Sequence, residues 1–122
     1  MKHISLIIFG VIASFGLSAQ VLVDGVNINT LAKTDYLEVE AHELLTEPNS
    51  YPTMAVHIDY GQKEKKGHQQ AISGADGVAI KFTSALNILN FISQNGWVLE
   101  TQNVIKDDKK GIVHYFLCRR RK

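Results

Sequence analysis

Two short alternating segments in the first half of the chain carry the residues best suited to chemistry. Residues 36–44 and 53–60 each alternate apolar and polar side chains, which is the period of a half-buried strand. If the two strands pair antiparallel, their polar side chains share one face and come within reach of one another. The histidines and carboxylates that we expect on this face are Glu40, His42, His57 and Asp59.

Imidazole nitrogens and carboxylate oxygens suggest two kinds of chemistry for this set. They are ligands of Zn²⁺ and other divalent ions, and they act as general acids and bases near neutral pH. The alternative is a solvated sheet face that carries cross-strand charge pairs. Because the chain has no HExxH, HxH or paired-cysteine spacing, this alternative is favoured. We therefore expect no cofactor and no catalytic residues, and the metal set stands as the alternative.

A serine and two glycines near the middle of the chain resemble catalytic or phosphate-binding motifs only superficially. Ser73 has neither a GxSxG context nor an evident base, as a nucleophile would require. Gly74 and Gly77 lack the lysine and the following helix N-terminus of a phosphate loop. A glycine-rich turn explains both features.

The remaining histidines and the cysteine predict structural positions. His114 alternates with Ile112 and Phe116, so we expect a hydrogen-bonded histidine among apolar groups. His68 lies in the charged stretch GQKEKKGHQQ and is expected in solvent. Cys118 is the only cysteine, so it has no internal disulfide partner and is expected to be buried. An intermolecular disulfide or a nucleophilic role would require an exposed thiolate of lowered pKa.

The chain ends in three arginines and a lysine, residues 119–122. A compact basic end of this kind binds phosphate or anionic glycans in some proteins. The favoured interpretation is a soluble and fraying strand terminus, whose charges also keep the sheet from adding further strands.

Residues 1–19 have the layout of a secretory signal peptide. Lys2 supplies the positive start, residues 4–15 are uncharged and mostly apolar, and Ala19 is the small residue that precedes a cleavage site. We therefore expect cleavage before Gln20 and a periplasmic or secreted product that does not span a membrane. An uncleaved membrane anchor is disfavoured because no basic flank follows the apolar stretch.

Composition limits the rest of the chain, residues 20–122, to one ordinary globular domain. The 122 residues are 45% hydrophobic and 20% charged, which argues against disorder or a disulfide framework. Once Lys2 is removed, basic and acidic residues are equal in number. This balance removes the long-range attraction expected of a dedicated nucleic-acid binder.

The hydrophobic pattern predicts an α+β fold with one principal helix packed on an antiparallel sheet of about four strands. Thr83 or Ser84 caps a helix that ends at Asn95 and Gly96. Its apolar stripe consists of Ala85, Ile88, Leu89 and Ile92, widened by Leu86 and Phe91. The other predicted elements are a lead-in arm at 21–33, a first hairpin of 36–44 with 53–60, a small hairpin of 71–72 with 78–82, and a second hairpin of 97–105 with a central strand at 112–119.

The runs FTSALNILNFISQNGWVLETQNV and VHYFLCRRR resemble small bacterial domains of unknown function in which a helix ends in Asn-Gly-Trp and a strand hairpin follows. The upstream runs VDGVNINTLAKTDYLEVEAHE and MAVHIDYGQ look like those of an uncharacterised exported group from Gram-negative bacteria. The resemblance implies an α+β fold and an exported soluble product. It implies no catalytic residues, and its motif residues Asn90, Asn95, Gly96, Trp97 and Tyr115 are markers of the fold.

Taken together, these features predict an exported, non-enzymatic domain that binds a protein or cell-envelope component through a sheet face or the loops at residues 61–77. The alternative is a metal-dependent or acid–base enzyme that uses His42, His57, Asp59 and Glu40. Pairing of two copies through a free sheet edge is a further possibility for a chain with so modest a core.

Overall fold

The structure is a computed structural model that describes residues 19–44, 48–65 and 67–122. The predicted signal peptide, apart from Ala19, lies outside the described residues. The fold is mainly β: of the described residues, 44% lie in strands and 13% in helices. In chain order, the elements are β1 (Leu22–Val23), β2 (Val26–Asn27), the 3₁₀ turn η1 (Ile28–Thr30), β3 (Tyr36–Leu44), β4 (Thr53–Asp59), β5 (Ile72–Ser73), α1 (Ala85–Gln94), β6 (Trp97–Asp107) and β7 (Gly111–Arg120).

The larger sheet has four antiparallel strands in the order β4-β3-β7-β6. Both predicted hairpins form: β3 pairs with β4 and β6 pairs with β7. The predicted central position of the last strand is confirmed, since β7 lies between β3 and β6. A bulge between Leu99 and Thr101 interrupts the β6–β7 ladder near the start of β6.

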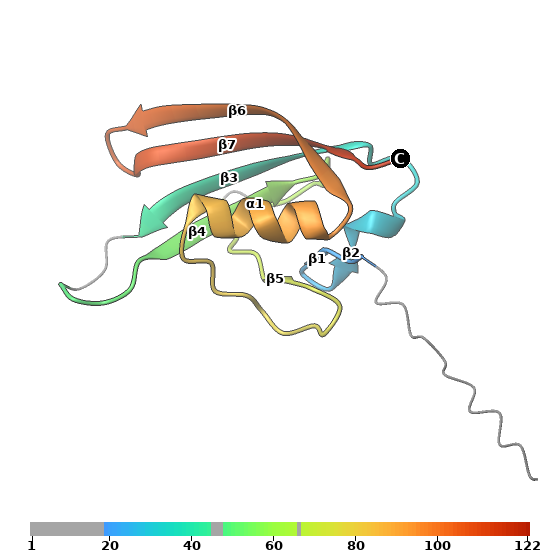
Figure 1. Ribbon diagram of the computed structural model, residues 1–122, viewed down its shortest axis with the longest axis horizontal. Helices are drawn as coiled ribbons and strands as arrows, with labels where there is room; N and C mark the ends of the chain where they lie inside the picture. Colours follow the sequence, from blue (N-terminus) through green and yellow to red (C-terminus); the bar gives the residue numbers. More distant parts are fainter. Residues whose placement is uncertain (1–18, 45–47, 66) are drawn as a thin grey trace, which may run out of the picture.

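One face of the four-stranded sheet is covered and carries the core. Figure 1 shows α1 lying across this face, with the short strands β1, β2 and β5 beside it. Alternate residues of β3 and β7 point into this layer because side chains alternate across a strand. The fully buried members of the core include Val21, Val23, Ile28, Leu37, Val39, Ala41, Ile58, Ile88, Ile92, Trp97, Phe116 and Cys118.

A second, three-stranded sheet in the order β2-β1-β5 was not anticipated from the sequence. Asp24 and Gly25 both have positive φ, 50° and 81°, so β1 and β2 are joined by the tight turn that hairpins favour. β5 pairs with β1. The predicted small hairpin of 71–72 with 78–82 is reduced to one isolated bridge between Ser73 and Ala79.

The prediction of an α+β fold with one principal helix on a single sheet is therefore wrong. The chain forms two sheets, and its helix is a short element of 10 residues. The strands of the smaller sheet are two residues long. Such strands are too short to show the alternation by which strands are recognised, and only pairing over a long separation in sequence creates them.

The ends of α1 follow the predicted local chemistry. Ser84 is the N-cap and accepts a hydrogen bond from the Asn87 N–H at 3.0 Å. Gly96, which follows the helix, has φ of +93°, a conformation that glycine adopts without a Cβ clash. Ile88 and Ile92 are buried as predicted, but Leu86 is 66% exposed, so it does not extend the apolar stripe.

Candidate metal centre

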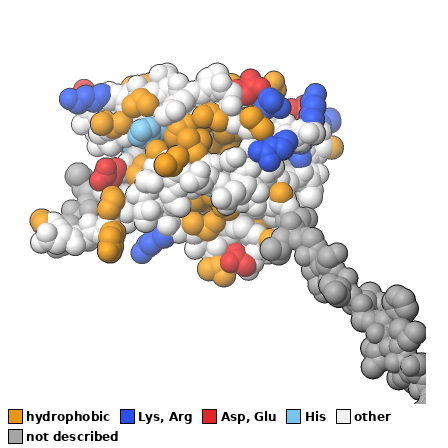
Figure 2. Space-filling model, viewed as in Figure 1, with side chains coloured by type: hydrophobic (Ala, Val, Ile, Leu, Met, Phe, Trp, Pro, Cys, Tyr) orange, Lys and Arg blue, Asp and Glu red, His pale blue; other side chains and the backbone are white. Residues whose placement is uncertain are grey.

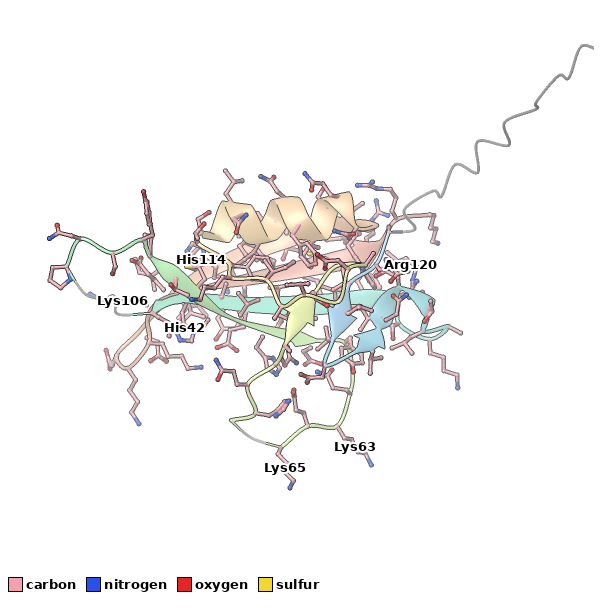
Figure 3. All side chains as sticks on the ribbon, turned by 90° about the horizontal axis from the view of Figure 1, so that it is seen from below. His42, Lys63, Lys65, Lys106, His114 and Arg120 are labelled. Carbon is pink, nitrogen blue, oxygen red and sulfur yellow. The ribbon has the colours of Figure 1, made fainter. Side chains whose placement is uncertain are left out.

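The segment between β4 and β5 leaves the sheet on the side opposite α1 (Figure 3). It returns through Gln70, whose side-chain amide accepts from the Ile58 N–H at 2.7 Å and donates to the Ile58 carbonyl at 2.8 Å. Ala71 then exchanges two hydrogen bonds with Asp24, at 2.8 and 2.9 Å. The loop is thus fastened both to β4 and to the turn between β1 and β2.

These attachments bring together three metal-ligating residue types, in Asp24, Glu64 and His68. His68 Nε2 lies 2.9 Å from an Asp24 carboxylate oxygen and 3.7 Å from a Glu64 carboxylate oxygen. One ligand atom from each of the three residues lies within 4.8 Å of the others. Among the residues that the structure describes, no other group of three histidines, cysteines or carboxylates converges this closely.

His57 extends this group from the sheet side. Its Nε2 atom lies 2.7 Å from the second carboxylate oxygen of Glu64. The Glu64 side chain is only 17% exposed, while that of His57 is 41% exposed. We call Asp24, His57, Glu64 and His68 the histidine–carboxylate cluster.

Both carboxyl groups of the cluster are held in the ionised form. The pKa of Asp24 is lowered by the hydrogen bond from the Ala71 N–H and by the bond to His68. For Glu64, partial desolvation opposes ionisation, but the hydrogen bonds with His57 and Gln70 outweigh it and its pKa is also lowered. The cluster therefore carries negative charge near neutral pH.

The ligand types and spacing fit a divalent transition-metal ion. Zinc takes nitrogen and oxygen ligands at about 2.0–2.2 Å, so ligand atoms around a tetrahedral ion lie about 3.4 Å apart. The distances from His68 Nε2 to the two carboxylates bracket this value. Lys63 and Lys65 point outward at the tip of the loop (Figure 3).

Three residues of the cluster, His57, Glu64 and His68, line a groove of about 900 Å³ that runs beside β4. Its walls come from β4, from the loop that carries Glu64 and His68, and from the segment around Phe82. All four residues of the sequence-predicted site, Glu40, His42, His57 and Asp59, also line this groove.

The structure gives these four predicted residues different partners. Glu40 and His57 are directly opposite each other on β3 and β4, but Glu40 forms an ion pair with Lys110 at 2.8 Å. His57 is hydrogen-bonded to Glu64 instead. His42 stands opposite Ala55, and Asp59 accepts a hydrogen bond from the Gly61 N–H at 2.9 Å. Of the four, only His57 belongs to the histidine–carboxylate cluster.

Sequence reasoning missed Asp24, Glu64 and His68 as a group. Asp24 falls in the predicted lead-in arm at 21–33, and His68 is predicted only to be exposed to solvent. His68 is indeed exposed, yet it is bonded to Asp24 across 44 positions in the sequence. No local pattern carries this information, because the contact depends on the path of the intervening loop.

The other two residues of interest lie in β7. Cys118 is completely buried, as predicted, and burial raises the pKa of its thiol to about 11, which makes it a poor nucleophile. His114 stacks on Phe116 with ring centroids 5.9 Å apart. Its buried Nδ1 atom has no hydrogen-bond partner among the described residues, so the expectation of a hydrogen-bonded histidine is wrong at this atom.

Three arginines of the basic end are engaged within the fold. Arg119 pairs with Glu100 at 2.7 Å, and Arg121 donates to the Ser93 carbonyl at 3.3 Å. Arg120 donates to several backbone carbonyls, including that of Thr34 at 2.6 Å. The expected frayed terminus is therefore wrong for the three arginines: Arg119 and Arg120 lie in β7, between β3 and β6, and not at a sheet edge.

Comparisons of the chain with protein-family models, with curated proteins and with solved structures found no match. Within the described part of the chain, no helix has the length and apolar character needed to cross a bilayer.

Proposed function

We propose that this chain is an exported binding domain whose ligand is a divalent transition-metal ion. Asp24, Glu64 and His68 are its ligands. His57 binds the second oxygen of Glu64 and orients it, as outer partners of metal-ligating carboxylates do. The observation that carries the proposal is the convergence of three ligand atoms within 4.8 Å from two segments of the chain.

The construction of the site supports a metal in preference to a simple surface ion pair. The Asp24 carboxylate accepts a hydrogen bond from the Ala71 N–H, while the Asp24 N–H donates to the Ala71 carbonyl. The Glu64 carboxylate is hydrogen-bonded to His57 and Gln70. Carboxylates oriented in this way lose less conformational freedom when they bind an ion. Because their pKa values are lowered, both carboxyl groups are ionised at neutral pH, which is the form that binds a metal ion.

Zinc titration by calorimetry on the purified, chelator-treated protein tests the proposal. We expect one Zn²⁺ per chain and a loss of affinity of about tenfold or more in Asp24→Asn and His68→Ala. His42→Ala is the matched control, because His42 lines the same groove outside the cluster, and its affinity should be unchanged. Equal affinity in His68→Ala and the parent protein would exclude the site.

A second candidate is a metal-dependent enzyme, and the groove is the observation that favours it. Three protein ligands leave a coordination position for water or substrate, and three residues of the cluster line a groove of about 900 Å³. Cobalt substitution distinguishes the two roles. Small anions such as thiocyanate change the visible spectrum if the fourth position is open, and they leave it unchanged if the ion is fully enclosed.

The exported location rests on the leader at residues 1–19. Fractionation of the native host followed by intact mass spectrometry tests it. A periplasmic or secreted chain that starts at Gln20 supports the proposal, and a full-length chain in the cytoplasm contradicts it.

A further inference from the structure

Each carboxylate of the histidine–carboxylate cluster has one oxygen that is held by the protein and one that faces His68. In Asp24, Oδ1 accepts the hydrogen bond from the Ala71 N–H at 2.9 Å, while Oδ2 lies 2.9 Å from His68 Nε2. In Glu64, Oε2 lies 2.7 Å from His57 Nε2, while Oε1 lies 3.7 Å from His68 Nε2. The two carboxylates therefore turn one oxygen each toward the same imidazole nitrogen.

A second donor makes Oε2 the more heavily bonded oxygen of Glu64. The Gln62 side-chain amide donates to Oε2 at 3.3 Å, in addition to the bond with His57. The Gln70 amide nitrogen lies 3.3 Å from both oxygens, so it does not distinguish them, and it also donates to the Ile58 carbonyl at 2.8 Å. A carboxylate oxygen has two lone pairs, and His57 and Gln62 together use those of Oε2.

From this geometry we infer that the cluster binds its ion through one oxygen of each carboxylate, and that it thereby selects a transition metal over calcium. The ligand atoms are Asp24 Oδ2, Glu64 Oε1 and His68 Nε2. The inference rests on the proposed function, since it names the binding atoms and the ion selectivity of the same cluster. Binding through both oxygens of either carboxylate would break the hydrogen bonds that hold its second oxygen.

His68 supplies the nitrogen ligand of the set. Its Nε2 atom shares a hydrogen bond with Asp24, so it binds an ion as the neutral tautomer, whose proton is on Nδ1. Imidazole is a ligand for zinc, copper, nickel and iron, whereas calcium takes about six to eight oxygen ligands. Two carboxylates that each give one oxygen would leave most of the calcium coordination sphere to water. A tetrahedral zinc ion needs one further ligand beyond these three.

Acidic side chains on the α1 face of the molecule are scattered. Figure 2 shows that they lie singly on this face rather than in a group. The loop that carries Glu64 and His68 leaves the sheet on the other side (Figure 3). Titration with divalent ions is therefore expected to report on the cluster.

A crystal structure of the zinc-loaded protein tests the assignment of the ligand atoms. We expect zinc–oxygen distances of about 2.0–2.2 Å to Asp24 Oδ2 and to Glu64 Oε1. The second oxygens should remain bonded to Ala71 and His57. Zinc bound by both oxygens of Glu64, or through Oε2, overturns the inference while the proposed function stands. Absence of zinc from the cluster contradicts both.

Calorimetry with zinc and with calcium, on the purified and chelator-treated protein, tests the selectivity. The parent should bind zinc and should give no saturable heat with calcium over the same concentrations. Calcium that binds as tightly as zinc overturns the inference, although the cluster would still be a site for divalent ions.

His57→Phe removes the shortest hydrogen bond to Oε2 and retains an aromatic ring. Glu64 can then bind an ion with both oxygens, so calcium affinity should rise while zinc affinity falls about tenfold. A variant that only loosens the fold would weaken the binding of both ions by the same factor, so the ratio of the two affinities is decisive. An unchanged ratio, or calcium that still gives no saturable heat, contradicts the inference.

Gln69→Ala is the matched control. Gln69 is exposed, lines the same groove and precedes Gln70 in the chain, but it lies outside the set of donors that hold the two carboxylates. Its zinc and calcium affinities should equal those of the parent. A change in their ratio as large as that in His57→Phe would show that any change in this loop alters selectivity, and it would overturn the inference.

Discussion

Arg120 lies over the indole ring of Trp97, with its Cζ atom 5.1 Å from the ring centroid. The same guanidinium donates to the carbonyls of Asn29, Leu31 and Thr34, at the end of the 3₁₀ turn η1. A positive charge is attracted electrostatically to the face of an aromatic ring and to the free carbonyls at the end of a helical turn. Arg120 therefore fastens the last strand to the N-terminal segment, more than 80 residues away in the sequence.

Removing this guanidinium should destabilise the whole domain. We expect Arg120→Ala to lower the free energy of unfolding by about 2–4 kcal/mol, because hydrogen bonds from a charged donor are each worth about 1.5–3 kcal/mol. Arg120→Lys should recover little, since a lysine cannot reproduce the planar fork. Urea denaturation measures both. The control, Arg121→Ala, should change stability by less than about 0.5 kcal/mol.

Gly96 is expected to resist substitution. Its φ is +93°, and a Cβ atom there would lie 3.1 Å from Asn29 Nδ2, whose amide donates to the Asn95 carbonyl. Gly96→Ala should therefore lower the melting temperature through a loss of about 1–3 kcal/mol. Gly74→Ala provides the comparison, because its Cβ would meet only Phe91 at 3.7 Å. If the two variants melt alike, Gly96 is not constrained as the structure indicates.

Stability should fall in acid. The pKa of Asp24 is lowered in the folded protein from its ordinary value of 3.8 by the Ala71 and His68 hydrogen bonds. A carboxyl group of this kind stabilises the fold above its unfolded pKa, and the stabilisation is lost as pH falls through the folded pKa.

We therefore expect the free energy of unfolding to be nearly constant above about pH 5 and to decline below about pH 4. Urea titrations at a series of pH values measure this decline, in chelator so that bound metal does not contribute. Asp24→Asn should show a shallower decline, with the remainder due to groups such as Asp107, whose pKa is also lowered. An unchanged slope in Asp24→Asn would refute the assignment.

Cys118 should not react with thiol reagents in the native protein. Its side chain is completely buried and its pKa is about 11, so a thiol reagent such as Ellman's should react only after urea is added. Cys118→Ser should cost about 1–3 kcal/mol because it buries a hydroxyl among apolar groups. Cys118→Ala avoids this penalty and should be the milder change. Rapid labelling of the native protein would show that β7 is open to solvent.

Local patterns predicted the elements whose signals are local. The alternation in β3 and β4 and the pairing of β6 with β7 are confirmed, as are the Ser84 cap and the left-handed Gly96. The second sheet was missed because strands as short as Leu22–Val23 and Ile72–Ser73 have no period to detect. Their pairing required knowledge of which distant segments meet.

The amino-acid sequence by itself determined which side chains of β3 and β4 face the core and where the helix begins and ends. These properties depend on spacings of a few residues. Only the tertiary structure decided that His57 turns to Glu64 and that His68 meets Asp24. These contacts depend on the path of the loop between β4 and β5. That path is fixed where Gln70 accepts a hydrogen bond from the Ile58 N–H and where the Ala71 N–H donates to Asp24, 47 positions away in the sequence. Local sequence patterns do not predict hydrogen bonds between residues that are distant in the sequence. The candidate metal centre therefore could not be predicted without the folded structure.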